Sequence, residues 1–307
     1  MPIDCSIILL SYNGDPLIRE TLAAVLAQKT RRSFQVIVID SDSSDGSVAY
    51  LRQQPVRLVQ ISSSEFGHGA TRNQGARMAE SPLLVFLTQD AVPATANWLD
   101  NLLTPLSDPR VGAVYGRQLP RDTHFCERFF LEQTYPPVPL RRVPRPGKPS
   151  TLRDIFLSNV QSACRKEVWR QCPFDEALVM CEDQQWAKDV LRHGYEIVYE
   201  PKASVYHSHR YTPKQVFKRY FDTGASLRYV TQGRLGISPR EFLSYVVKEC
   251  RLAAREESIT SIPYVLLYEM CRMTGFATGA IEPWLPLGLK IRLSQNWRHW
   301  ARRAEGA

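Results

Sequence analysis

The 307-residue sequence contains no long hydrophobic run. Its longest stretch without a charged residue, 258–268, is far shorter than the roughly 18 residues of a candidate membrane-spanning helix. The first residues lead directly into an apolar run and lack the basic segment that begins a signal peptide. We therefore expect a cytoplasmic protein without a transmembrane helix.

Cysteine motifs are also absent. The seven cysteines are scattered along the chain, and no two have Cys-x-x-Cys spacing. An odd, dispersed set argues against a disulfide framework and against a cysteine zinc site. It favours reduced thiols, which agrees with a cytoplasmic location.

Residues 1–206 carry no net charge, because 23 basic side chains balance 23 acidic ones. Residues 207–307 hold 16 basic and 8 acidic residues, and so supply the whole formal charge of +8. A general nucleic-acid-binding protein usually spreads positive charge over the face of its fold, so this distribution disfavours that class. Phospholipid headgroups, a pyrophosphate-linked lipid or a nucleic acid could each attract the basic tail, and a solvated surface without a partner is the alternative.

Apolar and helical patterns alternate along the first part of the chain. Runs typical of buried strands occur at 6–11, 34–39, 56–61, 83–88 and 111–116, and helical stripes occur near 18–26, 70–79 and 98–106. A strand, a helix and a strand in about 35 residues make a right-handed unit of a parallel sheet. The sequence thus predicts an α/β fold whose mainly parallel sheet is flanked by helices.

Polar residues follow three of these strands. In open α/β sheets, ligands bind beyond the carboxyl ends of the strands, so these residues should converge on one site. They are Tyr12, Asn13, Asp40, Asp42, Gln89 and Asp90. A carboxylate such as Asp90 suits a divalent cation held together with substrate phosphates. Ordinary turn and capping chemistry is the alternative for the acidic segment 40–46.

The glycine-containing segment 67–75 does not match the dinucleotide-binding pattern Gly-x-Gly-x-x-Gly, and it follows the third strand rather than the first. A dinucleotide-binding site is therefore disfavoured. Arg72 within this segment suits a phosphate or a base edge.

Two further groups of candidate residues come later in the chain. Glu182 and Asp183 begin a helix predicted to end near residue 193, although carboxylates in this position also stabilise a helix dipole. Short strands are predicted at 196–199 and 203–207. His207 and His209 share one face of an extended segment, as metal or phosphate contacts require, and hydrogen-bonded surface histidines are the alternative.

Six prolines in 136–149 exclude regular structure there and predict an extended loop, a candidate lid. Beyond residue 212 the pattern becomes helical, with aromatic stripes between charged residues and two tryptophans among the arginines of 296–303. Basic amphipathic helices with tryptophan suit a membrane surface, and packing on the sheet domain is the alternative.

Five segments in this order resemble the inverting family 2 glycosyltransferases with a GT-A fold. They are 6–13, 38–46, 69–76, 86–90 and 182–183, and the resemblance covers about residues 4–211. Segments 66–73 and 207–211, with Thr-Gln-Asp-Ala at 88–91, look most like bacterial rhamnosyltransferases that build O-antigen or other surface polysaccharides. The resemblance implies a GT-A domain over 1–211 and a C-terminal helical extension over 212–307.

The resemblance also implies roles for the candidate residues. Tyr12, Asp40 and Asp42 would hold the nucleoside, and Arg72 would lie against the base or the diphosphate. The remaining residues of the nucleotide-sugar site would be Ser11, Asn13, Gln89 and Asp90.

Asp90 would bind the metal of the family's Asp-x-Asp motif, with His207 first and His209 second as further ligands. Asp183 of the Glu182-Asp183 pair would be the general base that accepts the proton of an attacking hydroxyl. The sequence departs from the family at Thr88, which stands where the motif has its first carboxylate.

The implied cofactor is a divalent metal, Mg²⁺ or Mn²⁺. The implied donor is dTDP-L-rhamnose, and the implied acceptor is a lipid-linked or saccharide hydroxyl. We expect no nucleic-acid partner, and a homo-oligomer is left open. The basic tail suggests peripheral binding to the anionic inner face of the cell membrane. Alternatives are another nucleotide sugar, a non-catalytic nucleotide-sugar or membrane-binding module, and a nucleotidyltransferase, for which segment 12–14 lacks a phosphate-binding loop.

Overall fold

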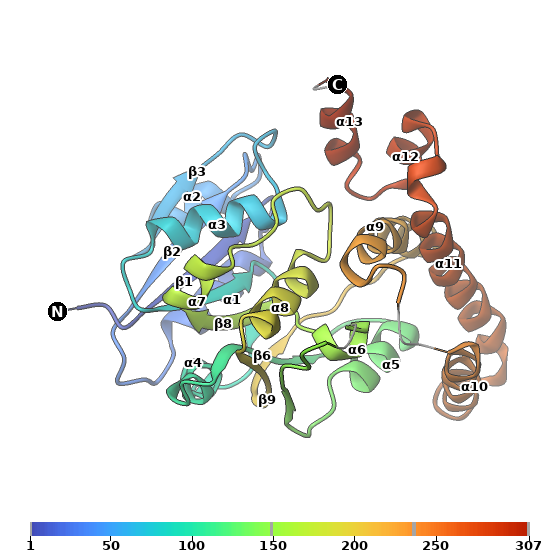
Figure 1. The fold of residues 1–307 in the computed structure, drawn as a ribbon, viewed down its shortest axis with the longest axis horizontal. Helices are drawn as coiled ribbons and strands as arrows, with labels where there is room; N and C mark the ends of the chain where they lie inside the picture. The colour runs from blue at the N-terminus through green and yellow to red at the C-terminus, as the bar shows by residue number, and fades with distance from the viewer. Residues whose placement is uncertain (1, 148–149, 235–237, 306–307) are drawn as a thin grey trace.

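The structure, a computed structural model, describes residues 2–147, 150–234 and 238–305. Within these residues, one nine-stranded sheet has the strand order β3-β2-β1-β4-β8-β6-β9-β5, and β7 pairs with another stretch of β9. Figure 1 shows helices on both sides of this sheet and the last helices gathered at one side of the molecule. The predicted α/β architecture is confirmed.

The strands are β1 (Cys5–Ser11), β2 (Phe34–Asp40), β3 (Arg57–Gln60), β4 (Leu83–Thr88), β5 (Val92–Pro93), β6 (Val111–Leu119), β7 (Leu140–Arg142), β8 (Gln161–Arg165) and β9 (Glu196–Tyr206). In the described chain, six strands run in one direction, and β5, β7 and β8 run in the other. Antiparallel β8 separates β4 from β6, so the sheet is mainly parallel but interrupted near its centre.

The helices are α1 (Leu17–Leu26), α2 (Ser47–Leu51), α3 (His68–Met78), α4 (Trp98–Leu103), α5 (Phe125–Thr134), α6 (Leu152–Ile155), α7 (Lys166–Gln171), α8 (Glu182–Arg192), α9 (Pro213–Thr231), α10 (Pro239–Glu256), α11 (Ile262–Ala280), α12 (Leu287–Leu293) and α13 (Trp297–Glu305). Alternate residues of β1 face opposite sides of the sheet. Ile7 and Leu9 pack in the core with α1 and α4, whereas Ile8 and Leu10 pack in the core with α3, α7 and α8.

The two short strands predicted around Pro201 form one strand, β9. Its pairing with β6 shifts between Gly116 and Arg117, where the partner changes from Glu200 to Ser204. Pro201 lies in the stretch that this shift leaves without a partner on β6. A proline has no N–H to donate to a ladder, so it is tolerated at such a bulge.

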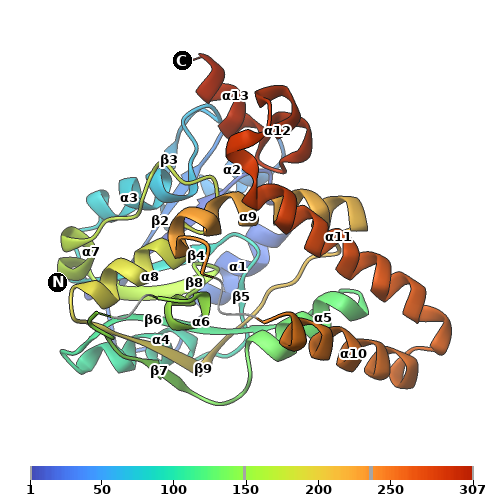
Figure 2. The same ribbon diagram turned by 45° about the vertical axis from the view of Figure 1, so that its right-hand side comes forward.

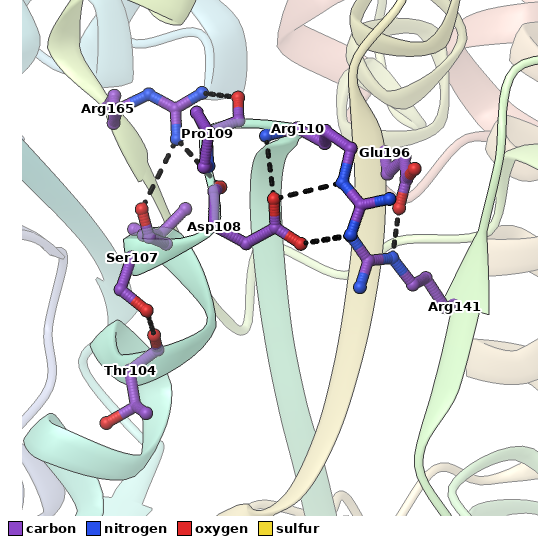
Figure 3. A network of polar contacts seen from close by, with 9 residues as sticks. Thr104, Ser107, Asp108, Pro109, Arg110, Arg141, Arg165 and Glu196 are labelled. Atoms are coloured by element: carbon purple, nitrogen blue, oxygen red, sulfur yellow. Dashed lines mark hydrogen bonds and ion pairs between the residues drawn. The ribbon is translucent and has the colours of Figure 1, made fainter.

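The proline-rich segment 136–149 is not irregular throughout, so that prediction is wrong at residues 140–142. These residues form β7, which pairs with β9. Figure 3 shows how Arg141 of β7 contacts Asp108 and Glu196, with Arg141 Nη2 2.6 Å from Asp108 Oδ2. This polar network lies at the amino ends of β6 and β9, opposite the candidate site. Residues 148–149 lie outside the described residues.

Helices α9 and α11 pack in close contact along each other. A Cβ atom on Gly275 or Gly279 of α11 would lie only 2.4 or 2.0 Å from a carbonyl oxygen of α9, so glycine is required for this approach. Figure 2 shows α11 running along α9 and extending beyond the sheet together with α10. In the described parts of the chain, no helix has both the length and the apolar character needed to cross a bilayer.

Helix α13 returns from this helical region towards the sheet. Asp222 of α9 accepts a hydrogen bond from the Asn296 backbone N–H at 2.9 Å, which fixes the segment before α13. Trp300 is buried in a cluster with Phe221 of α9. Arg302 donates a 2.9 Å hydrogen bond to the backbone oxygen of Phe66, in the loop after β3. Helix α13 of the basic tail thus contacts the loop between β3 and α3.

Candidate active site

Asp90 and two histidines meet beyond the carboxyl ends of β4 and β9. His207 Nε2 lies 3.6 Å from Asp90 Oδ1, and His209 Nε2 lies 3.9 Å from Asp90 Oδ2. One possible ligand atom from each of the three residues lies within 4.8 Å of the others. The structure therefore brings together the three residues that the sequence suggested as metal ligands.

Gln118 at the end of β6 orients His207. Its Nε2 donates to Tyr135 Oη at 2.6 Å and to Ser158 Oγ at 3.0 Å, so its Oε1 faces His207 Nδ1 at 2.8 Å. An amide oxygen only accepts, so Nδ1 carries the proton and Nε2 keeps its lone pair. That lone pair lies on the Asp90 side of the ring. Hydrogen bonds of this kind fix the tautomer of metal-binding histidines.

The electrostatics of this cluster also favour cation binding. Burial lowers the pKa of His207, and burial together with the adjacent His207 lowers the pKa of His209 to about 3. Burial acts to raise the pKa of Asp90, but the two histidines together with hydrogen bonds to its carboxylate lower it, and the net shift is downward. Near neutral pH the cluster therefore presents one carboxylate and two neutral imidazoles.

Glu182 and Asp183 begin α8 but have different surroundings. Glu182 Oε1 lies 2.7 Å from Arg72 Nη1, and both side chains are almost fully buried. Asp183 accepts backbone hydrogen bonds from Asn159 at 3.2 Å and from Gln184 at 2.9 Å. Among the described residues, Asp183 has no basic side chain within 4.0 Å.

These surroundings separate the two carboxyl groups electrostatically. Burial and the charge of Glu182 raise the pKa of Asp183 to about 7. Burial acts to raise the pKa of Glu182, but the Arg72 guanidinium, together with His68 and hydrogen bonds to the carboxylate, holds the pKa of this carboxyl below its usual value. A pair of carboxyl groups with pKa values pushed apart is typical of a site that uses one of them to accept a proton.

Residues 157–160 join the two groups of candidate residues. Ser158 Oγ accepts from Gln118, which in turn contacts His207, whereas the next residue, Asn159, donates its backbone N–H to Asp183. The carboxylate of the predicted base and the histidine cluster are therefore linked through hydrogen bonds to one short segment before β8.

The predicted nucleotide residues lie at the ends of β1, β2 and β4. Gln89 accepts from the Tyr12 backbone N–H at 2.8 Å and donates to the Tyr12 carbonyl at 2.9 Å, so the ends of β4 and β1 are tied together. The Tyr12 side chain is 40% exposed. The Arg298 guanidinium of α13 lies 6.0 Å from the centre of its ring. The tail thus reaches the predicted nucleoside site.

The end of β2 is organised by Asp40, which is fully buried and accepts from Ser43 N at 2.9 Å and from Ser43 Oγ at 2.5 Å. The same Ser43 hydroxyl accepts from the Asn13 backbone N–H at 2.8 Å. Asp42 is exposed with a left-handed φ of 70°. Ser11 is buried, and its hydroxyl has no hydrogen-bond partner in the described chain.

The sequence predicted neither the ion pair between Arg72 and Glu182 nor the contact of Gln118 with His207. Arg72 is engaged by Glu182, and its further contacts are the carbonyl oxygens of His68 and Asn159, so its predicted contact with a base or diphosphate stays a prediction. Gln118 was missed because its role depends on pairing between β6 and β9. A polar residue interrupting the largely apolar β6 was the available signal.

This chain is similar to known glycosyltransferases along nearly its whole length. A family model described as "Glycosyl transferase family 2" matches residues 6–160. The O-antigen chain rhamnosyltransferase WbaN of Salmonella anatum is 32% identical over 300 residues, which cover 96% of this chain and 95% of the relative. The O-antigen chain rhamnosyltransferase RfbN of Salmonella typhimurium is 30% identical over 301 residues, with the same two coverages.

Solved structures show the same fold. The mannosyltransferase PcManGT from Pyrobaculum calidifontis, in complex with GDP-Man and Mn²⁺, aligns with a TM-score of 0.58 at 19% identity, over 92% of this chain and 88% of that chain. Residues 1–349 of TarS from S. aureus, in complex with UDP-GlcNAc, align with a TM-score of 0.52 at 16% identity, over 92% and 91% of the two chains. These similarities confirm the predicted GT-A architecture.

Proposed function

Because this chain belongs to glycosyltransferase family 2, we propose that it transfers L-rhamnose from dTDP-L-rhamnose to a hydroxyl of a lipid-linked or saccharide acceptor. The product would be part of an O-antigen type surface polysaccharide. The observation that carries this proposal is the alignment of two O-antigen chain rhamnosyltransferases over 96% of the chain, which includes the C-terminal helices.

In the proposed reaction, Asp183 is the general base. Its carboxylate takes the proton of the acceptor hydroxyl while the hydroxyl oxygen attacks the anomeric carbon of the donor. The bond from that carbon to the diphosphate breaks, and the diphosphate leaves with the bonding electrons. One displacement inverts the anomeric centre. Glu182, held ionised by Arg72, raises the proton affinity of Asp183.

The cluster of Asp90, His207 and His209 fits a divalent cation, because it offers one ionised carboxylate and two neutral imidazole nitrogens at short mutual distances. Mg²⁺ prefers oxygen ligands, whereas imidazole nitrogen suits transition metals, so the donor set favours Mn²⁺ over Mg²⁺. A bound ion supplies positive charge that stabilises the departing diphosphate. Complexes of a structural neighbour with GDP-Man and Mn²⁺ support this proposal.

The experiment that tests the donor uses dTDP-rhamnose, UDP-glucose, UDP-N-acetylglucosamine and GDP-mannose with the purified enzyme and a lipid-linked saccharide extract. Release of nucleoside diphosphate and the mass of the extended acceptor are measured together. We expect both signals with dTDP-rhamnose. Product formed only from another donor would overturn the choice of rhamnose, and no transfer from any donor would overturn the enzymatic function.

We also propose that the helical region rests on an anionic membrane surface where such an acceptor would lie. Leu266, Met270 and Met273 form a stripe on α11, and each is about half exposed. The net positive charge of the chain lies in the same third of the sequence. Positive charge and exposed apolar side chains together suit a surface of anionic lipid.

Co-sedimentation with vesicles tests this membrane proposal. The wild-type protein should sediment with phosphatidylglycerol vesicles and less with phosphatidylcholine vesicles. A Leu266→Glu/Met270→Glu variant should remain in the supernatant because its stripe carries negative charge. Binding that is equal for both vesicle types, or that survives in this variant, would overturn the proposal.

A further inference from the structure

Arg219 of α9 is a partly buried cation without a carboxylate partner in the described part of the chain. Its Nη1 donates to the Tyr211 hydroxyl at 3.1 Å, and its guanidinium carbon lies 5.4 Å from the centre of the Tyr211 ring. Within residues 2–147, 150–234 and 238–305, no carboxylate oxygen lies within 4.0 Å of this guanidinium, and its other donors have no protein acceptor. The tyrosine hydroxyl supplies a dipole but no negative charge.

The surroundings of Arg219 offer little compensation for its charge. Tyr211 and Tyr220 act on it more than any carboxyl group does, but their raised pKa values leave both uncharged near neutral pH. Glu127 of α5 is the carboxyl group that acts on it most, but this side chain is buried, and burial raises the pKa of its carboxyl. A cation that is taken partly out of water without a counter-charge is costly. The free energy that this placement costs would be recovered by an anionic ligand.

The position of Arg219 indicates where such a ligand would bind. The Tyr211 ring that it covers lies against the His209 ring at an angle of 32°, with ring centres 4.8 Å apart. His209 Nε2 in turn lies 3.9 Å from Asp90. Arg219, Tyr211, His209 and Asp90 therefore form one continuous row, in which Arg219 is at the end opposite Asp90 and the Tyr211 ring separates it from the candidate metal cluster.

The electrostatic influence of Arg219 agrees with this position. Burial and His207 lower the pKa of His209 to about 3, and the positive charge of Arg219 adds to this decrease. Burial lowers the pKa of His207, and Arg219 again adds to the effect. Its field thus reaches both histidines of the cluster.

Two other buried arginines differ from Arg219 because each has a carboxylate partner within the protein. Arg72 is paired with Glu182 at 2.7 Å, and Arg272 of α11 is paired with Glu269 at 3.0 Å. Arg272 also lies over the rings of several aromatic residues in the helical region. Both of these arginines have counter-charges within the protein, whereas Arg219 has none among the described residues.

We propose that Arg219 binds the diphosphate of the nucleotide-sugar donor and neutralises the negative charge that develops on it as the sugar departs. This inference rests on the proposed function, since it takes a nucleoside diphosphate as the ligand. It adds a residue of the C-terminal helices, beyond the region that the family model matches, to the donor site. A guanidinium suits this role because it offers several donors in one plane to phosphate oxygens.

The test measures binding of dTDP, UDP, GDP and thymidine to the full-length protein with Mn²⁺ by calorimetry, together with the melting temperature. Arg219→Gln should weaken binding of the preferred nucleoside diphosphate by at least about tenfold, as loss of a charged hydrogen bond predicts. Its affinity for thymidine and its melting temperature should stay close to those of the wild type. The affinity of Arg219→Lys for the diphosphate should lie between those of the wild type and of Arg219→Gln, because lysine keeps the charge and loses the planar donors.

Arg272→Gln is the matched control, since it removes a buried arginine that has a protein counter-charge. It should lower the melting temperature and leave nucleotide affinity unchanged. Unchanged diphosphate binding in Arg219→Gln would overturn the inference, as would an equal loss for thymidine and for the diphosphate. A wild-type protein that binds none of the three diphosphates would overturn the proposed function itself and the inference with it.

Discussion

Arg72 Nη1 lies 2.7 Å from Glu182 Oε1, and this buried ion pair joins two segments that are 110 residues apart in the sequence. The pair keeps Glu182 ionised next to Asp183. The second carboxyl group therefore has a raised pKa, because a like charge and burial both act against its ionisation. The pair thus prepares Asp183 to accept a proton, and variants of Arg72, Glu182 and Asp183 test this arrangement.

Replacing Arg72 with Gln should destabilise the fold by about 3–5 kcal/mol, because Glu182 is left as a buried charge without a partner. The double variant Arg72→Gln/Glu182→Gln should lose much less free energy of unfolding than the two single variants lose in sum. Chemical denaturation of the four proteins measures this coupling. Additive losses would show that the two side chains do not interact as the structure describes.

Asp183→Asn should reduce transfer by about 10²–10⁴-fold, the range expected when a general base is lost. Donor affinity should stay nearly unchanged. The folded-state pKa of Asp183 lies above its unfolded value, so the stability that it contributes is present in acid and is lost as pH rises through about 7. At pH above 7 the variant should therefore be at least as stable as the wild type. Lost donor binding in the folded variant would contradict the base assignment.

The pH dependence of transfer gives a separate test. Asp183 must be ionised to accept a proton, so kcat/KM should rise as pH increases through about 7 and then level off. Glu182→Gln should move this rise to lower pH, because the neighbouring negative charge is removed. A rise at the same pH in both proteins would mean that another group controls the rate.

The sequence predicted those parts of the fold whose patterns are local. The strands β1, β2 and β4 are largely apolar runs, and the polar residues that end or follow them include the candidates Asp40, Gln89 and Asp90. Such runs are visible because both faces of a central parallel strand are buried.

The parts that were missed depend on contacts between distant segments. The strand β8 has the short sequence Gln-Ser-Ala-Cys-Arg, which carries no strong strand pattern and is stabilised by β4 and β6 on its two sides. The partner of Arg72 could not be read from the sequence for the same reason. A buried arginine in a glycine-containing helix suggests an anion, but not whether that anion is a ligand or Glu182.

Gln118 provides a test of the metal cluster that leaves its ligands intact. Gln118→Leu removes the hydrogen bond that holds His207 Nδ1–H, so Mn²⁺ should bind about 10–100-fold more weakly. Titration of Mn²⁺ followed by electron paramagnetic resonance measures the affinity. Gln35→Leu is the control, because Gln35 of β2 hydrogen bonds to Ser6 and does not contact the cluster. Equal Mn²⁺ affinity in both variants would contradict the role of Gln118.

The central claim is that Asp183 promotes a single displacement at the anomeric carbon. The most direct measurement is the anomeric configuration of the newly formed linkage, determined by nuclear magnetic resonance from the coupling at the anomeric carbon and compared with that of the donor. The account predicts the opposite configuration in donor and product. A product with the configuration of the donor would contradict the account, because one displacement cannot retain it.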